Sequence, residues 1–381
     1  MREHDVFSAD GTRIRVWRTK ADGPDVLLSP GLGAVPTLWP ELPAARVHSW
    51  YHRGTMASDR PADPGRIRLD DHVADAVAVL DAGGVERCVV MGWSMGVTVA
   101  AALALRHPER VSGLMLVAGV PGDAFGSVLG LPGVPVELRR LIGVSGVTAL
   151  KAAGPLLDAV LHRLPVPDPG RFAGLAGLGR LASLAELSGL GRLAELSGLG
   201  RLSELSGLGR LSELSGLGRA AGLADLPGLR RLAGLPGLGG LAALGRLAGL
   251  GGGLDGSSAA APAGSLAGSL RRYLQHDWRW YFTLALALGR SPRLDLTGVT
   301  CPTTVLAGRY DLLASTDGVV GPVAGLPQAR VRLLPNTHFL PLEDPQLVAD
   351  ELDLLLDRAD AVHRAVHELD GPLTSRSRPR A

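Results

Sequence analysis

The chain has 381 residues, of which 46% are hydrophobic, enough to bury one large core or two smaller ones, and only 4% are aromatic. Its formal net charge of +2 gives no reason to expect a polyanionic partner, and we predict no nucleic-acid binding. Residues 1–5 do not resemble a signal peptide and no run of 18 apolar residues occurs, so we expect a cytoplasmic protein.

Strand patterns open the chain, and a helix follows them. Residues 11–19 and 25–29 alternate or run apolar, as strands do. Leu69, Val73, Val77 and Leu80 then keep helical spacing behind two candidate N-caps, Asp70 and Asp71. Strands that alternate with helices predict an α/β fold, in which a mostly parallel sheet carries helices on both faces.

Ser94 lies in the run Gly-Trp-Ser-Met-Gly, between an apolar strand at 87–91 and an apolar helix at 97–105. The pattern Gly-x-Ser-x-Gly is weak by itself in a chain with 52 glycines, so its context carries the prediction. A sharp strand-to-helix turn lifts a serine oxygen clear of the sheet, where a histidine can take its proton. The same turn directs the N–H of Met95 toward the oxygen that becomes negative during attack on an ester carbonyl. We therefore predict that Ser94 is a catalytic nucleophile.

A triad of this kind needs an acid and then a histidine later in the chain. The apolar strand 302–307 leads to Asp311, and the short strand 331–334 leads to His338. Both residues follow the carboxyl ends of strands, where open α/β sheets hold their sites. We predict that His338 is the general base and then the acid, and that Asp311 orients it.

Other side chains compete for these two roles. Asp123, just beyond the apolar strand 113–118, is the rival acid. Among the other histidines, one lies at a helix end, three lie near the termini, and four lack a preceding apolar strand. These are His107, then His4, His363 and His367, then His52, His72, His162 and His276.

The alternation of strands and helices stops near Pro121 and returns near Leu294. We predict a helical lid at 123–290, inserted between two core parts at 1–122 and 291–365, and a disordered tail at 366–381. Within the lid, 173–262 is of low complexity, with nine-residue copies such as 198–206 and 207–215. Leucine recurs there every third residue, and steps of about 300° carry it around a helix instead of along one face. We favour a tolerated expansion; a lipid-binding or self-associating surface is the alternative.

Aromatic residues gather at the end of the predicted lid, among them Trp278 and Tyr281. They either wall a substrate pocket or pack the lid on the core. Together with Trp93 and Phe339, which adjoin the predicted nucleophile and base, they form our candidate pocket. The two cysteines, Cys88 and Cys301, lie in or beside apolar strands, so we expect reduced core residues and no metal site.

In this order the segments resemble the α/β-hydrolase superfamily, of the compact bacterial kind with a lid inserted in the sheet. The resemblance covers about residues 20–122 and 291–358, and the segment 338–345 resembles the catalytic-histidine segment of the family. Residues 26–33 resemble its oxyanion loop, which implies that the N–H of Leu32 is a second donor beside that of Met95. Two departures concern loop shape. Pro30 stands where members commonly have histidine, and 51–58 reads Tyr-His-Arg-Gly-Thr-Met-Ala-Ser in place of Asp-x-Arg-Gly-x-Gly-x-Ser.

The residues and the resemblance predict a serine hydrolase that cleaves a carboxylic ester of an apolar small molecule through an acyl-enzyme, without a cofactor. Acyltransferases, thioesterases and cofactor-free perhydrolases use the same triad and remain alternatives. A serine in place of an aspartate nucleophile argues against dehalogenases and epoxide hydrolases. From another class, a non-catalytic binding protein or a lipid-surface protein on the same fold remains open. The sequence leaves the substrate and the oligomeric state undetermined.

Overall fold

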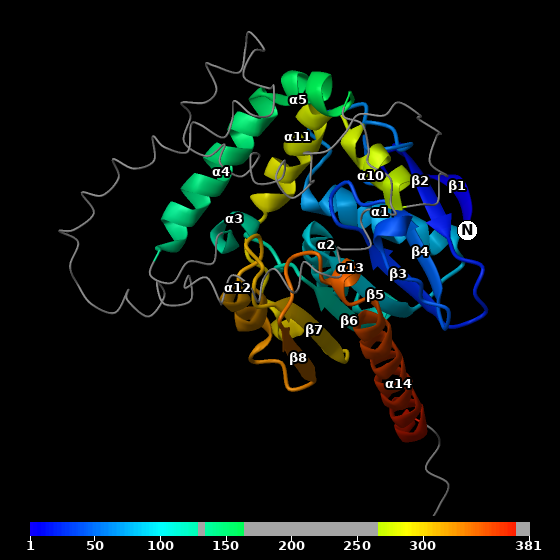
Figure 1. Ribbon diagram of the computed structural model, residues 1–381. Helices are drawn as coiled ribbons and strands as arrows, with labels where there is room; N and C mark the ends of the chain where they lie inside the picture. Colours follow the sequence, from blue (N-terminus) through cyan, green and yellow to red (C-terminus); the bar gives the residue numbers. More distant parts are fainter. Residues whose placement is uncertain (129–133, 164–265, 371–381) are drawn as a thin grey trace, which may run out of the picture. The chain divides into compact units, whose positions relative to one another are not determined.

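A computed structural model describes residues 1–128, 134–163 and 266–370 of the chain (Figure 1). By their contacts, the described residues form one compact unit. The predicted repeat at 173–262 and the tail beyond residue 370 lie outside the described residues.

Eight strands form one sheet in the order β1-β2-β4-β3-β5-β6-β7-β8. The strands are Arg2–Phe7, Arg13–Arg18, Asp25–Ser29, Arg46–Trp50, Cys88–Trp93, Val111–Val117, Thr303–Gly308 and Ala329–Leu334. From β4 onward across the sheet neighbouring strands are parallel, whereas β1 and β2 form an antiparallel edge. The predicted α/β fold with a mostly parallel sheet is therefore confirmed, and β1 and β4 are two strands that the sequence did not reveal.

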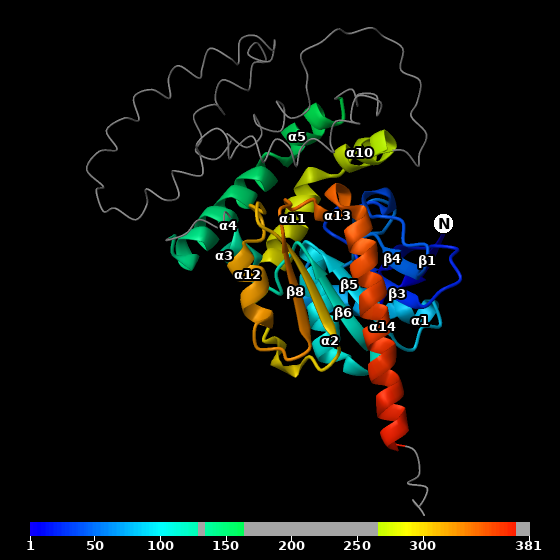
Figure 2. The same ribbon diagram turned by 60° about the horizontal axis from the view of Figure 1, so that its bottom comes forward.

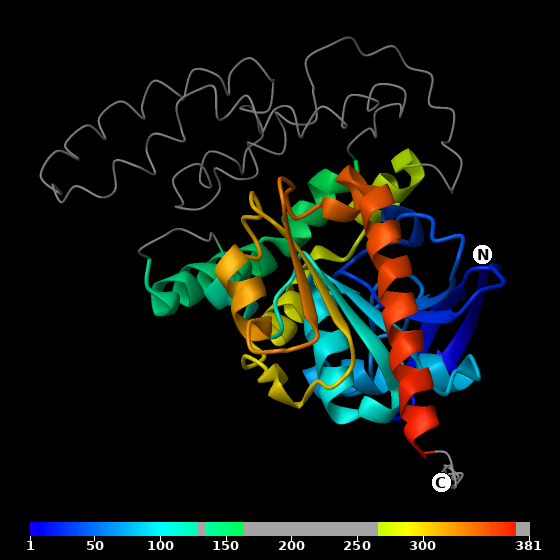
Figure 3. The same cartoon turned by 90° about the horizontal axis from the view of Figure 1, so that it is seen from below.

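Helices cover both faces of the sheet, because the side chains of a buried strand alternate between the faces. On one face α1 (Leu69–Ala82) and α2 (Met95–Arg106) pack against residues such as Val90 and Leu114. On the other face α14 (Pro345–Asp370) packs against residues such as Met91 and Met115 (Figures 2 and 3). The helix α14 continues to Asp370, so residues 366–370, which were predicted to be disordered, are helical.

The start of α1 differs from the prediction. The N-cap is Arg68, and Asp71 lies at the third helical position, where its carboxylate accepts the backbone N–H of Arg68 at 2.9 Å. Asp70 is exposed and pairs with Arg106 instead. A carboxylate within the first turn still stabilises the helix, since it satisfies a backbone donor and faces the positive end of the helix dipole.

Among the described residues, five α-helices lie between β6 and β7 in the chain, and we call them the cap helices. They are α3 (Ala124–Ser127), α4 (Val136–Ala152), α5 (Gly154–Leu161), α10 (Leu266–Leu274) and α11 (Trp278–Gly289). The helix α11 packs against α4 and α5 (Figure 1). Over the described ranges, no single helix is long and apolar enough to cross a membrane; α4 and α5, bent by 64°, pass that test only as a pair.

Short elements complete the described chain. They are the 3-10 turns Pro36–Leu38, Pro108–Arg110, Leu296–Gly298 and Gly321–Val323 and the short helices α12 (Thr316–Val320) and α13 (Leu340–Glu343). Both cysteines are free and buried, as predicted. Burial raises the pKa of the Cys88 thiol to about 12 and that of Cys301 to about 11, which keeps both protonated and unreactive.

Candidate active site

Ser94 occupies the turn between β5 and α2, with φ 56° and ψ −123°. A positive φ is costly for a residue with a Cβ, and such strain persists only where the surroundings impose it. The glycines on either side allow the turn. A Cβ on Gly92 would lie 2.6 Å from the carbonyl oxygen of Gly96, and one on Gly96 would lie 2.2 Å from that of Ser29. The local sequence therefore produces the sharp turn that was predicted.

The three predicted catalytic side chains meet at the carboxyl ends of β5, β7 and β8. The Nε2 atom of His338 lies 2.7 Å from Oγ of Ser94, and its Nδ1 atom lies 2.9 Å from Oδ2 of Asp311. A carboxylate only accepts hydrogen bonds, so Nδ1 carries the proton and Nε2 presents its lone pair to the serine hydroxyl. This is the arrangement in which a histidine can act as a base toward a serine.

Asp311 is held in place by its own loop. Its Oδ1 atom accepts the backbone N–H groups of Leu313 and Ala314, both at 2.8 Å. The rival acid Asp123 caps α3, and its two carboxylate oxygens pair with Arg140 at 2.8 and 2.7 Å. The structure thus brings Asp311 to His338 and engages Asp123 elsewhere.

The loop after β3, residues 30–33, passes beside Ser94, and we call it the oxyanion loop. A Cβ on Gly31 would lie 3.5 Å from Cβ of Ser94. The carbonyl of Gly31 accepts the N–H of Ala34 at 3.0 Å. In a trans peptide the N–H points opposite to the C=O, so the N–H of Leu32 is directed away from this bond. Met95 is the first residue of α2, and its N–H has no partner within the helix. The N–H groups of Leu32 and Met95 therefore remain predicted donors to the negative oxygen of the transition state.

The predicted pocket residues have different surroundings. Trp93 is buried, and its indole N–H donates to the carbonyl of His338 at 3.1 Å, so it supports the loop of the base. Trp278 is buried against the rings of Tyr273 and Tyr281, and its indole N–H donates to the carbonyl of Leu274. Phe339 is 52% exposed with its ring 6.0 Å from that of His338. Their roles toward a substrate remain predictions.

The cap helices contact the oxyanion loop directly. The hydroxyl of Tyr281 donates to the carbonyl of Leu32 at 3.3 Å and therefore accepts from Tyr273, whose hydroxyl lies 3.1 Å away. Burial raises the pKa of both phenols, which keeps them protonated. The ring of His276 comes within 3.1 Å of the place a Cβ on Gly33 would take, and the indole of Trp280 donates to the carbonyl of Arg53.

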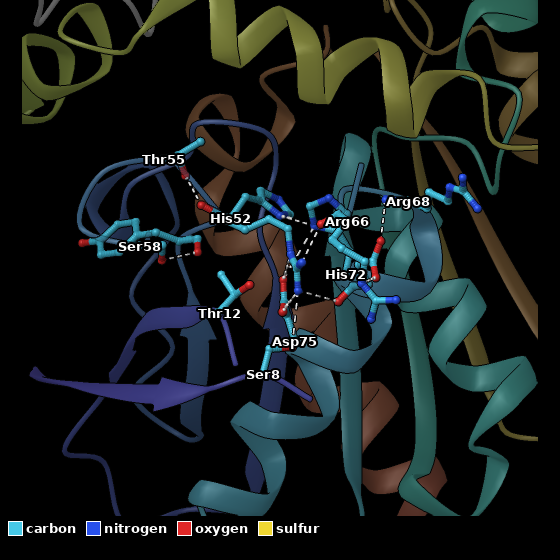
Figure 4. A network of polar contacts seen from close by, with 12 residues as sticks. Ser8, Thr12, His52, Thr55, Ser58, Arg66, Arg68, His72 and Asp75 are labelled. Carbon is cyan, nitrogen blue, oxygen red and sulfur yellow. Dashed lines mark hydrogen bonds and ion pairs between the residues drawn. The ribbon is translucent and has the colours of Figure 1, made fainter. Parts of the chain in front are cut away.

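A buried polar network on the other side of the loop was missed by the sequence analysis (Figure 4). His52 donates from Nε2 to the carbonyl of Pro30 at 2.9 Å, and its Nδ1 atom lies 3.3 Å from Nδ1 of His72. Arg53 is fully buried and pairs with Asp75 and Asp10. His52 had been set aside for want of a preceding apolar strand, yet β4 ends two residues before it. The available signal was weak: the run Arg46–Trp50 contains the strand-favouring residues Val47 and Trp50.

In the parts of the chain that the structure describes, no three His, Cys, Asp or Glu side chains are grouped so as to hold a metal ion.

Comparisons with known proteins agree with this fold. A family model described as alpha/beta hydrolase fold matches residues 24–133. The proposed carbamate hydrolase RutD of Caulobacter segnis is 39% identical over 99 residues, 25% of this chain and 37% of that protein. The 2-hydroxymuconate semialdehyde hydrolase of Pseudomonas sp. strain CF600 is 43% identical over 93 residues, 23% of this chain and 32% of that protein. The chain thus aligns with about a third of the length of these curated relatives.

Solved structures extend the likeness in fold. The esterase RhEst1 from Rhodococcus sp. ECU1013 has a TM-score of 0.54 at 17% identity, covering 94% of this chain and 99% of that one. A thermophilic esterase from Thermogutta terrifontis has a TM-score of 0.51 at 16% identity, covering 94% and 99%. Such low identities show the fold alone. The sheet that presents Ser94 in this turn therefore has the α/β-hydrolase fold, which the family model matches over residues 24–133 and which these structures share over most of the chain.

Proposed function

We propose that the protein is a serine hydrolase that cleaves a carboxylic ester of an apolar small molecule. The observation that carries this proposal is the hydrogen-bonded row from Ser94 through His338 to Asp311, at 2.7 and 2.9 Å, in a turn that fixes the serine. A structural serine does not need a strained backbone and a buried histidine that is itself oriented by a carboxylate.

In the proposed reaction, each group of the site has one role. Nε2 of His338 takes the proton of Ser94 as Oγ attacks the ester carbonyl, and Asp311 stabilises the imidazolium that forms. The N–H groups of Leu32 and Met95 stabilise the negative oxygen of the tetrahedral intermediate. The alcohol then leaves with the proton from His338, and an acyl group remains on Ser94. Water, activated by His338, attacks this acyl-enzyme and releases the acid.

The names of the relatives favour hydrolysis but differ in substrate, and they include a carbamate hydrolase and a semialdehyde hydrolase. The choice of an ester therefore comes from the triad and not from these names. Thioesters and acyl acceptors other than water are compatible with the same chemistry, because they pass through the same acyl-enzyme.

A fluorophosphonate probe tests the nucleophile, since it reacts with serines that a neighbouring base has activated. The full chain, Ser94→Ala and the control Ser112→Ala are each treated with the probe and assayed on nitrophenyl esters of two to sixteen carbons. Ser112 lies near the start of β6, at the opposite end of the strands from the triad. We expect labelling of the wild type and of Ser112→Ala, and a fall in kcat of roughly 10⁵- to 10⁶-fold in Ser94→Ala.

The preferred chain length then measures the pocket, and a competing alcohol or thioester separates hydrolysis from acyl transfer. A wild-type protein that is neither labelled nor active on any ester would contradict the proposal and favour a non-catalytic binding protein on this fold.

A further inference from the structure

His52 is a buried histidine beside the oxyanion loop for which the triad has no use. His52 is 1% exposed, and its Nε2 atom lies 2.9 Å from the carbonyl oxygen of Pro30. Proline has no backbone N–H and no polar side chain, so this carbonyl is the only polar group that Pro30 can offer.

The surroundings fix the direction of the hydrogen bonds. A carbonyl only accepts, so Nε2 of His52 carries the proton. Burial lowers the pKa of His52 to about 4, which leaves the ring neutral and its Nδ1 atom unprotonated. Nδ1 of His72, 3.3 Å away, must then donate to it. The charged groups that face the pair are Arg53 and Asp75, whose Oδ2 atom lies 4.0 Å from Nδ1 of His72.

The bond to Pro30 constrains the peptide that carries the predicted donor. Gly31 follows Pro30, and glycine has the freest backbone of all residues. The carbonyl before Gly31 is held by His52, and the carbonyl of Gly31 itself is held by the N–H of Ala34. Two fixed carbonyls define the planes of both peptides around Gly31, and with them the direction of the Leu32 N–H. Without His52, the first of these planes loses its side-chain support.

We propose that His52, oriented by His72, is a positioning residue that sets the direction of the Leu32 N–H through the carbonyl of Pro30. The inference rests on the proposed function, because it assigns to that bond the geometry of the oxyanion hole. A donor displaced by a fraction of an ångström stabilises the negative oxygen of the transition state less well. Binding of the uncharged substrate changes little, so the loss falls on kcat.

Three variants of the full chain test this. His52→Phe removes the donor, and His52→Gln keeps an N–H donor on a side chain of similar reach. His48→Phe is the matched control, because His48 is also buried, lies on β4, and binds Asp25 at 2.7 Å at the start of β3, away from the site. We expect kcat on the best nitrophenyl ester to fall 10- to 100-fold in His52→Phe, with KM within threefold of wild type. His52→Gln should keep a kcat at least fivefold higher than His52→Phe, and His48→Phe should keep the wild-type kcat.

A second measurement tests the hydrogen bond between His52 and Pro30 without an activity assay. In protein labelled with ¹⁵N-histidine, the His52 ring should be neutral and protonated at Nε2 between pH 5.5 and 8. Equal kcat in His52→Phe and His48→Phe, or a loss confined to KM, would overturn the inference, and so would a ring protonated at Nδ1. A wild type inactive on every ester would instead overturn the proposed function, and the ¹⁵N spectrum alone would then uphold or overturn the bond to Pro30.

Discussion

Two regions of opposite chemistry hold the oxyanion loop. On the core side the contact comes from charged and imidazole groups, with His52, Arg53, His72 and Asp75 all 1% exposed or less. On the cap side it comes from aromatic rings, with His276 and Tyr281 5.5 Å apart between centroids. The core-side bond joins residues 22 positions apart, and the cap-side bond from Tyr281 to Leu32 joins residues 249 apart.

The difference separates a support that holds both the fold and the site from one that acts on the site alone. The core-side network ties β4 and α1 together and is sealed from water, so its loss should reduce the stability of the whole sheet. The cap-side contact reaches the loop from helices that lie outside the sheet, so its loss should affect the loop with little effect on unfolding. Changes at the two sides can therefore be told apart by measuring activity and stability on the same variants.

The largest effect is expected at the triad that both sides serve. Asp311→Asn should lower kcat by about 10⁴-fold, because an amide cannot hold His338 in the required tautomer. Asp123→Asn, at the rival acid that pairs with Arg140, should leave kcat nearly unchanged. Steady-state kinetics on one nitrophenyl ester checks both. Comparable losses of kcat in the two variants would contradict the assignment of Asp311 as the one acid of the triad.

The next effect is on stability and tests the core side. Arg53 donates from Nε to Asp75 at 2.9 Å and from Nη1 to Asp10 at 2.8 Å, and Arg53→Leu leaves Asp75 buried without its cation. Breaking a buried pair in this way costs about 3–5 kcal/mol. The urea midpoint should fall strongly, far more than in Arg13→Leu, whose pairs with Asp5 and Asp59 are partly exposed. Adding Asp75→Leu to Arg53→Leu should restore part of the loss, and no restoration would contradict this account.

The three catalytic candidates were predicted from the sequence, whereas the residues that hold the oxyanion loop were not, and the reason is physical. Ser94, Asp311 and His338 each follow an apolar strand within a few residues, so local patterns placed them at one edge of the sheet. The edge strand β1 and the strand β4 carry charged residues among their apolar ones, and their pairing depends on partners elsewhere in the chain.

The supports depend on contacts that no short pattern contains. No local pattern marks His52 and Arg53 as buried, since a buried histidine or arginine becomes favourable only when partners such as Pro30, Asp75 and Asp10 are brought to it. The contact between Tyr281 and Leu32 joins a late helix to an early loop. Trp93 was predicted to line a pocket because it adjoins Ser94, and the bond from its indole N–H to the carbonyl of His338 is a contact that no local pattern contains.

A smaller effect is the change in the free energy of unfolding with pH, which again comes from the core side. Burial, the largest cause, lowers the pKa of His52 from 6.5 to about 4, so the unfolded chain binds a proton between these values that the folded chain does not. Stability is therefore full above pH 6.5 and falls as the pH drops toward 4. For His52 this amounts to about 2 kcal/mol between pH 7 and pH 5, and His72, whose pKa is also lowered by burial, adds in the same direction.

Urea unfolding of wild type and His52→Phe at pH 7 and pH 5 checks this linkage. The variant should lose less stability between the two pH values than the wild type, because one fewer group takes up a proton on unfolding. Parallel losses in both proteins would mean that His52 is already charged in the folded state.

The smallest effect isolates the cap side. Tyr281→Phe removes the hydroxyl that donates to Leu32 while keeping the ring that packs on His276, and Tyr273→Phe removes the neighbouring hydroxyl that does not reach the loop. A neutral hydrogen bond contributes about 1 kcal/mol, so kcat should fall about three- to tenfold in Tyr281→Phe and less in Tyr273→Phe. The urea midpoints of both should stay close to wild type. If Tyr281→Phe instead lowered the midpoint as Arg53→Leu does, the cap helices would be as much a part of the cooperative fold as the core network. The separation between support of the site and support of the fold would then be lost.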